Sequence, residues 1–129
     1  MNISDAEWDV MTVIWTKEPR TASQVIESLS STHQWNHRTI RTLLARLVEK
    51  GALTYDVSGT KYNYRAVVSQ HECVRKRSDS FLSKVFGGDV GALVAHFVEG
   101  RQLSPSEAEA LTKLLESSSQ RKSKKGKRS

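Results

Sequence analysis

The sequence predicts a mainly α fold with a small β-hairpin, in which an N-terminal winged helix-turn-helix is followed by a C-terminal helical region. Two observations lead to this prediction. Residues 1–68 contain three segments of helical periodicity, then two short segments in which apolar and polar residues alternate, and that order is typical of a winged helix. From residue 69 onward the apolar residues return to helical spacing, which indicates further helices.

Each of the first two helices is predicted to begin with a capping box. In this motif serine or threonine caps the helix, and the side chain of a glutamate or glutamine three residues later accepts a hydrogen bond from the N–H of the capping residue. The two boxes are SDAE at residues 4–7 and TASQ at residues 21–24. We expect the first helix to end before Pro19, because proline cannot continue a helix. The residues expected to face inward are Trp8, Met11, Ile14, Trp15, Val25, Ile26 and Leu29.

The third predicted helix begins at a cap on Asn36, ends at Gly51 and has two unlike faces. At about 100° per residue, one face is aliphatic and the opposite face is polar. The aliphatic face holds Ile40, Leu43, Leu44 and Leu47. The polar face holds Arg38, Arg41, Thr42, Ala45 and Arg46. No acidic residue lies between Asn36 and Arg46, so this stretch would not repel a phosphate.

A helix that reads DNA needs this division, because one face must bury against its own domain while the other enters the major groove. Arginine can bind the acceptor edge of guanine through two hydrogen bonds, and threonine can meet a phosphate or a thymine methyl. The residues expected to contact DNA are Asn36, His37, Arg38, Thr39, Arg41, Thr42 and Arg46, with Lys61 from the hairpin. The alternative is an ordinary amphipathic helix whose polar face is only solvated.

A β-hairpin is predicted at residues 53–66, where polar and apolar residues alternate on both sides of a turn at Ser58-Gly59. Near its tip, Lys61, with Arg65 behind it, can clamp a flanking phosphate or enter the minor groove. We expect two of its three tyrosines to belong to the core, because a small domain needs its aromatic side chains there.

Three further helices are predicted in the second half of the chain. The first is capped by Ser69 with Glu72 and ends at Gly87-Gly88, the second ends at Gly100, and the third begins at Ser104-Pro105. Their apolar stripes consist of Phe81, Leu82, Val85 and Phe86, then Val90, Leu93, Val94, Phe97 and Val98, and then Leu111, Leu114 and Leu115.

The net charge of +6 comes from the end of the chain. Residues 1–68 carry eight Lys and Arg against seven Asp and Glu, and residues 69–118 carry six against seven. Residues 119–129 carry six basic residues and no acid. This tail holds nothing that can pack, so we predict that it is disordered. The pI of 9.7 is therefore no argument by itself for binding nucleic acid.

The sequence gives no support for an enzyme, a metalloprotein, a membrane protein or a secreted protein. The chain has no nucleophile motif and no glycine-rich phosphate loop, so we expect neither an enzyme nor a cofactor. His71 and Cys73 would point about 200° apart on a helix, so we expect no metal site. The apolar runs are too short for a membrane span, the N-terminus lacks signal-peptide anatomy, and a single cysteine suits a reducing cytoplasm.

Four segments together resemble a known family. They are SDAEWDVMTVIW (residues 4–15), WNHRTIRTLLARLVEKG (35–51), FLSKVFGG (81–88) and ALVAHFVE (92–99). In these segments the chain is similar to the BlaI/MecI/CopY repressors, the penicillinase-repressor family, and the likeness runs from Ile3 to Leu115. The resemblance implies a cytoplasmic homodimer that binds an inverted repeat in double-stranded operator DNA, commonly built on TACA and TGTA half-sites, and represses transcription.

The resemblance also assigns the parts of the chain. Residues 1–68 would form the winged-helix DNA-binding domain, residues 69–118 a C-terminal helical dimerisation domain, and residues 119–129 a basic tail outside the likeness. DNA contacts carried over by motif position are Arg38, Thr39, Arg41, Thr42, Arg46 and Lys61. The implied dimer contacts are Phe81, Leu82, Val85, Val90, Leu93, Val94, Phe97, Leu111 and Leu115. The family usually has proline where this chain has His37.

Two modes of release occur in the family. In the β-lactam-responsive branch, a membrane metalloprotease sensor leads to cleavage at an Asn–Phe bond, and the matching bond here joins His96 to Phe97. In the copper-responsive branch, paired Cys-x-Cys motifs hold the metal, whereas this chain has only Cys73. The resemblance therefore implies release by cleavage. Two alternatives stay open: a winged-helix regulator released by a small ligand, and an architectural or interaction module that binds DNA through its basic tail.

Overall fold

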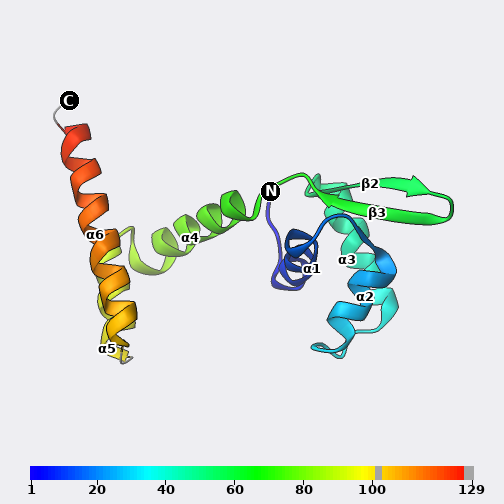
Figure 1. Ribbon diagram of the computed structural model, residues 1–129, viewed down its shortest axis with the longest axis horizontal. Coiled ribbons are helices and arrows are strands. Elements are labelled where there is room, and N and C mark those ends of the chain that lie inside the picture. Colours follow the sequence, from blue (N-terminus) through cyan, green and yellow to red (C-terminus); the bar gives the residue numbers. More distant parts are fainter. Residues whose placement is uncertain (101–102, 127–129) are drawn as a thin grey trace. The chain divides into compact units, whose positions relative to one another are not determined.

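The computed structural model describes residues 1–100 and 103–126, with side chains up to residue 118. Two compact units divide the chain, one formed by Met1–Ser78 and the other beginning at Asp79. The elements, labelled in Figure 1, are α1 (Asp5–Thr16), β1 (Arg20–Thr21), α2 (Ala22–Ser30), α3 (His37–Lys50), β2 (Leu53–Ser58), β3 (Lys61–Ala66), α4 (Gln70–Phe86), α5 (Val90–Gly100) and α6 (Pro105–Gly126). This order confirms the predicted sequence of three helices, a hairpin and three further helices.

The helices of the first unit begin at the capping residues that the sequence predicts. At the start of α1, Ser4 Oγ accepts from the Glu7 N–H at 3.2 Å, and Glu7 Oε1 accepts from the Ser4 N–H at 2.8 Å. The same reciprocal pair opens α2. Asn36 Oδ1 caps α3 by accepting from the Thr39 N–H at 2.8 Å. The helix ends at Gly51, whose φ of 86° is a left-handed conformation that glycine adopts without Cβ strain.

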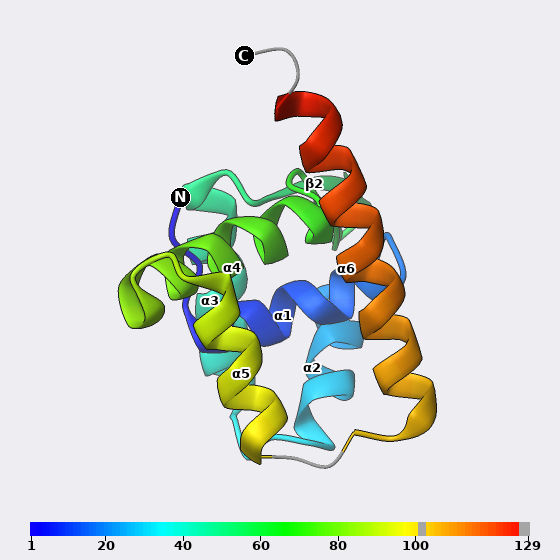
Figure 2. The ribbon, with the colours of Figure 1, turned by 90° about the vertical axis from the view of Figure 1, so that its left-hand side faces the viewer.

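The core of the first unit lies where α1, α2 and α3 pack against one another and against the base of the hairpin (Figure 2). The buried apolar residues are Val10, Met11, Ile14, Val25, Ile26, Leu29, Ile40, Leu43, Leu44, Leu47, Ala52 and Leu53. All four predicted aliphatic positions of α3 are among them. Since burying each such side chain is worth about 1.5–3 kcal/mol, this stripe fixes the rotation of α3 about its own axis.

The antiparallel sheet of this unit has the strand order β1–β3–β2. The register of β2 with β3 runs from Leu53 opposite Ala66 at the base to Ser58 opposite Lys61 at the tip. Leu53 is buried and the tip is exposed, so the hairpin extends from the helices as a wing (Figure 1). The short β1 pairs with β3 beside Tyr64. The sequence does not predict β1, because two residues are too few to show an alternating pattern.

The first part of α4 belongs to the first unit. Arg77 forms an ion pair with Asp5, and its guanidinium carbon lies 4.9 Å from the ring centroid of Trp8. These contacts hold α4 to α1, and the division between the units falls after Ser78, inside α4. The functional boundary between residues 68 and 69, which the resemblance assigns, stays a prediction.

The second unit has no fully buried apolar side chain among its described residues. Its larger half-buried side chains are Leu82, Phe86, Leu93, Val94 and Leu111. Its exposed large apolar side chains are Phe81, Val85, Val90, Phe97, Val98, Leu103, Leu114 and Leu115. Among the described residues, the last part of α4 together with α5 and α6 thus carries an apolar surface that this unit does not cover.

The backbone of α6 is helical through Gly126. This differs from the disorder predicted from residue 119, and residues 127–129 lie outside the described part. A segment of Lys, Arg, Gln and Ser without proline has adequate helix propensity, so an existing helix can propagate into it.

In the part of the chain that the structure describes, no single helix is long and apolar enough to cross a membrane. Taken together, α4 and α5 would be long and apolar enough, but the two helices are bent by 86° at the break between them. Within residues 1–100 and 103–126, no three His, Cys, Asp or Glu side chains form a group able to hold a metal ion. The pKa of the Cys73 thiol is raised, mainly by burial and to a lesser extent by the negative charge of Glu72. This thiol is therefore protonated at neutral pH.

Candidate nucleic-acid interface

The polar face of α3 is exposed from its cap to its third turn. The exposed residues are Asn36, His37, Arg38, Thr39, Arg41, Thr42, Ala45 and Arg46. The opposite face lies in the core, which confirms the two faces predicted from the helical spacing. Because its aliphatic side anchors the helix, the arginines project together away from the core of their own domain.

The guanidinium groups of the three arginines on this face are available to an external acceptor. In the described part of the chain, none of Arg38, Arg41 and Arg46 forms an ion pair with a carboxylate. The one ion pair of α3 among the described residues is made by Lys50, at its C-terminal end, with Glu7. A guanidinium that no carboxylate occupies can donate in pairs to a guanine edge or to phosphate oxygens.

The two threonines of the face direct their hydroxyl hydrogens into the helix. The Thr39 hydroxyl donates to Asn36 Oδ1 at 3.0 Å, and the Thr42 hydroxyl donates to the Arg38 carbonyl at 2.9 Å. Both side chains therefore present a methyl group and oxygen lone pairs outward. This arrangement suits a thymine methyl or a base donor better than a phosphate, which needs a donor from the protein.

The hairpin supplies one exposed cation near its tip. Lys61 forms no ion pair with a carboxylate of the described residues. In contrast, Arg65 Nε lies 3.5 Å from Asp56 Oδ2, so its charge is partly offset within the hairpin. Of the two predicted basic residues of the hairpin, Lys61 is the better placed to meet a phosphate.

The tyrosines of the hairpin differ from the expectation. Tyr64 packs against the core, whereas Tyr55 and Tyr62 are 41% and 45% exposed. Their rings stack on each other with centroids 4.6 Å apart and an interplanar angle of 8°. The prediction that two of the three tyrosines belong to the core is therefore wrong. The hairpin reaches beyond the helices, so these two rings stay partly exposed and stack on each other.

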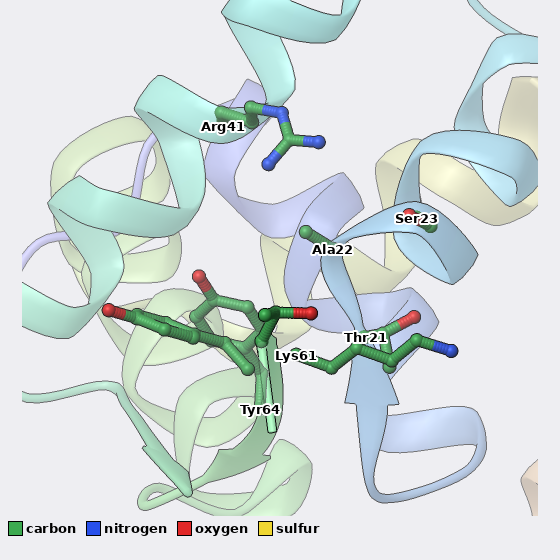
Figure 3. A pocket seen from close by; sticks show the side chains of 8 residues that line it. Thr21, Ala22, Ser23, Arg41, Lys61 and Tyr64 are labelled. Atoms are coloured by element: carbon green, nitrogen blue, oxygen red, sulfur yellow. The ribbon is translucent and has the colours of Figure 1, made fainter. Parts of the chain in front are cut away.

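A cleft of about 350 Å³ lies between α3, the start of α2 and the hairpin. Its lining residues are Thr21, Ala22, Ser23, Arg41, Thr60, Lys61, Tyr62 and Tyr64. Figure 3 shows the Arg41 guanidinium directed from α3 toward the side of α2 that holds Ala22, while the Lys61 side chain runs past Thr21. The lining combines two cations with several hydroxyl groups and includes no carboxylate.

The phenol of Tyr64 is a donor in this cleft at neutral pH. Burial raises the pKa of Tyr64, and the nearby charge of Arg41 opposes that effect only in part. The phenol therefore keeps its proton and can donate a hydrogen bond to an anion.

Sequence reasoning does not find most of the cleft residues. Thr21 is predicted as a helix cap, yet its place beside Lys61 results from the pairing of β1 with β3, which shows no sequence pattern. Tyr62 and Tyr64 lie two residues apart on β3, and the structure places both in the lining. Two features of the sequence could have indicated this cleft. They are the alternating pattern of the hairpin and the position of Arg41 at the edge of the polar face of its helix.

The residues predicted for dimerisation and cleavage lie on α4, α5 and α6. The His96–Phe97 bond lies within α5, and both side chains are exposed. The two rings meet edge to face, with centroids 6.2 Å apart, and His96 also lies 6.0 Å from the Phe86 ring. Any protease acting at this bond would need α5 to unwind locally.

The three packed helices, the wing and the exposed basic face define a winged helix-turn-helix protein. Residues 3–117 match the penicillinase repressor family, and the chain belongs to that family. It is 38% identical over 120 residues to the penicillinase repressor of Bacillus licheniformis, covering 93% of this chain and 94% of that protein. It is 37% identical over 113 residues to the methicillin resistance regulatory protein MecI of Staphylococcus aureus (strain N315), covering 88% and 92%.

Two solved structures each resemble just over half of the chain. The DNA-binding domain of the repressor BlaI matches with a TM-score of 0.51 at 40% identity, covering 54% of this chain and 84% of that one. The monomeric form of Bacillus licheniformis BlaI in complex with the blaP half-operator matches with a TM-score of 0.50 at 39% identity, covering 56% and 88%.

Proposed function

We propose that this protein is a cytoplasmic, dimeric, sequence-specific DNA-binding repressor that blocks transcription by occupying an inverted repeat. The observation that carries this proposal is the exposed face of α3, on which Arg38, Arg41 and Arg46 stand without a carboxylate partner among the described residues. Membership of the penicillinase repressor family and the likeness to BlaI bound to a half-operator support it.

In this proposal α3 enters the major groove and the hairpin lies along the backbone beside it. The exposed residues of α3 from Asn36 to Arg46 face the base edges and the adjacent phosphates, and Lys61 meets a flanking phosphate. A protein that neutralises phosphates releases counterions, so its binding should weaken steeply with salt.

The dimer in this proposal is held by residues 69–118. Support comes from the apolar surface of α4, α5 and α6, where Val85 and Val90 are 57% and 53% exposed and Phe97 is 46% exposed. Removing such a surface from water favours association. Two linked winged helices would then bind two half-sites together, which raises the effective concentration of the second domain once the first is bound.

The same repressor should prefer an inverted repeat of TACA and TGTA half-sites to a scrambled duplex by about a thousandfold. Fluorescence anisotropy with both duplexes measures this ratio. A chain that ends at Ser118 should keep the preference, because the basic tail supplies only sequence-independent attraction. Loss of the preference after this truncation would favour the architectural module, and equal binding of both duplexes by the full chain would contradict the repressor.

Release of the repressor, in this proposal, comes from cleavage at the His96–Phe97 bond by a membrane metalloprotease sensor system. A cut there divides the apolar stripe of α5, so each fragment loses dimer contacts. After exposure of the source cells to an inducer, intact-mass analysis should find two fragments that meet between residues 96 and 97. An intact chain that nevertheless leaves the operator would favour the regulator released by a small ligand.

A further inference from the structure

Arg41 occupies a different setting from the other two arginines of α3. At about 100° per residue, Arg41 lies about 60° to one side of Arg38, and Arg46 lies about 80° to the other side. Arg41 lines the cleft between α3, the start of α2 and the hairpin, whereas Arg38 and Arg46 do not. Figure 3 shows its guanidinium turned toward α2 and not straight out along the exposed face.

The cleft offers donors from three separate elements. Arg41 contributes the guanidinium from α3, and Lys61 and Tyr64 contribute an ammonium and a protonated phenol from the hairpin. At the start of α2, the N–H groups of Ala22 and Ser23 have no acceptor within the helix and lie at the positive end of its dipole. A lining that holds donors from three elements and no carboxylate suits the oxygens of one phosphate, each of which can accept several hydrogen bonds.

We propose that this cleft binds one backbone phosphate of the operator in each half-site, and that Arg41 binds this phosphate and not a base. Arg38 and Arg46 are then the arginines of α3 that read base edges. This inference rests on the proposed function and refines it. It separates a residue that positions the helix on the duplex from two residues that determine which sequence is preferred.

The direct test uses the inverted-repeat duplex with single backbone phosphates replaced, one at a time, by neutral methylphosphonate. In each half-site, one replacement should weaken the full-length wild-type protein by about tenfold or more. The same replacement should weaken the Arg41→Ala variant much less, because the variant has already lost the guanidinium while Lys61 and Tyr64 remain. The inference is overturned if no phosphate position shows this difference between the wild type and the Arg41→Ala variant. The same negative result is expected if the cleft binds only free phosphate.

The Arg41→Ala variant should also weaken the inverted repeat and the scrambled duplex by the same factor. The slope of log K against log salt should become shallower by about 0.9 for each subunit, the value for one lost phosphate contact. By contrast, Arg46→Ala should reduce binding to the inverted repeat far more than binding to the scrambled duplex. If Arg41→Ala instead behaves as Arg46→Ala should, Arg41 reads a base and the inference is wrong.

Two further variants test the cleft without removing its main charge. Arg41→Lys should recover part of the lost affinity, because an ammonium binds phosphate as a point charge but cannot form the two parallel bonds that guanine needs. Tyr64→Phe should weaken both duplexes equally and by less than Arg41→Ala. Its matched control is Tyr55→Phe, since Tyr55 lies on the same hairpin but outside the lining, and its binding should be unchanged. An Arg41→Lys variant as weak as Arg41→Ala would oppose the inference.

Failure of this inference is distinguishable from failure of the proposed function. A wild-type protein without preference for the inverted repeat would contradict both. A wild-type protein that has the preference, with a base-specific loss in Arg41→Ala, would contradict only the phosphate assignment. Because Arg41 is exposed, its replacement should leave the fold intact, which far-ultraviolet circular dichroism checks.

Discussion

Replacing Leu93 by aspartate should convert the protein to monomers and weaken binding to the inverted repeat by about a hundredfold or more. Leu93 is half-buried in the apolar stripe of α5, and Val90 and Phe97 on the same stripe are about half exposed. In the proposed dimer the partner covers this stripe, so an unpaired carboxylate there would cost about 3–5 kcal/mol. Sedimentation velocity measures the oligomeric state, and anisotropy measures the binding.

The matched control for this variant is Ala95→Asp. Ala95 is exposed on the same helix, about 160° away from Leu93, so the same charge is added outside the stripe. This control should remain dimeric. The Leu93→Asp protein should bind a single half-site as the wild type does, because the winged helix has its own core. Dimers that survive both Leu93→Asp and Phe97→Asp would place the interface elsewhere.

Replacing Lys50 by methionine should lower the free energy of unfolding of the first unit by about 2 kcal/mol at neutral pH. Glu7 is 2% exposed, and its Oε1 lies 2.5 Å from Lys50 Nζ. Methionine keeps an unbranched apolar side chain but leaves the carboxylate of Glu7 buried without its cation. This loss of free energy is smaller than is usual when one partner of a buried ion pair is removed, because the Lys50 side chain is 36% exposed and water screens its charge.

The cost of Lys50→Met should depend on pH. Burial raises the pKa of Glu7, but hydrogen bonds from Lys50 and Ser4 outweigh burial and hold this pKa below its ordinary value of 4.5. The wild-type pair therefore stabilises the fold fully above pH 4.5, and its contribution is lost as the pH falls through the lowered pKa of Glu7. The difference between wild type and variant should shrink over that acid range, as urea unfolding at several pH values would show.

Two controls separate the ion pair from a general effect of removing lysine. Lys17→Met removes an exposed lysine at the end of α1 and should change the free energy of unfolding by less than about 0.5 kcal/mol. The double variant Glu7→Gln, Lys50→Met should recover part of the loss, because replacing both partners leaves no buried charge. A Lys50→Met cost that stays constant down to pH 3 would mean that the ion pair is not its origin.

The local structure of the winged helix could be predicted because its signals lie within a few residues of one another. Ser4 with Glu7 marks the start of α1, and Asn36 and Gly51 mark the two ends of α3. These residues act on their own backbone, so their effect needs no tertiary context. The aliphatic stripe of α3 predicts which face is buried for the same reason, since the helix repeat alone sets the spacing.

Other features of the site could not be predicted in this way. The stacking of Tyr55 on Tyr62 depends on how far the hairpin reaches past the helices. The contact of Arg77 with Trp8 joins two residues that lie far apart in the chain. Neither distance is encoded in a local pattern.

The sequence by itself determined the order of the helices and the hairpin, the caps, the buried stripe of α3 and the basic character of its opposite face, because residues close together in the chain specify all of these. Only the tertiary structure decided that Arg41 shares a cleft with Lys61 and Tyr64, while Arg38 and Arg46 remain outside it. The physical reason is that the pairing of β1 with β3 brings the hairpin beside the start of α2. Contacts between distant segments form only when the whole core packs.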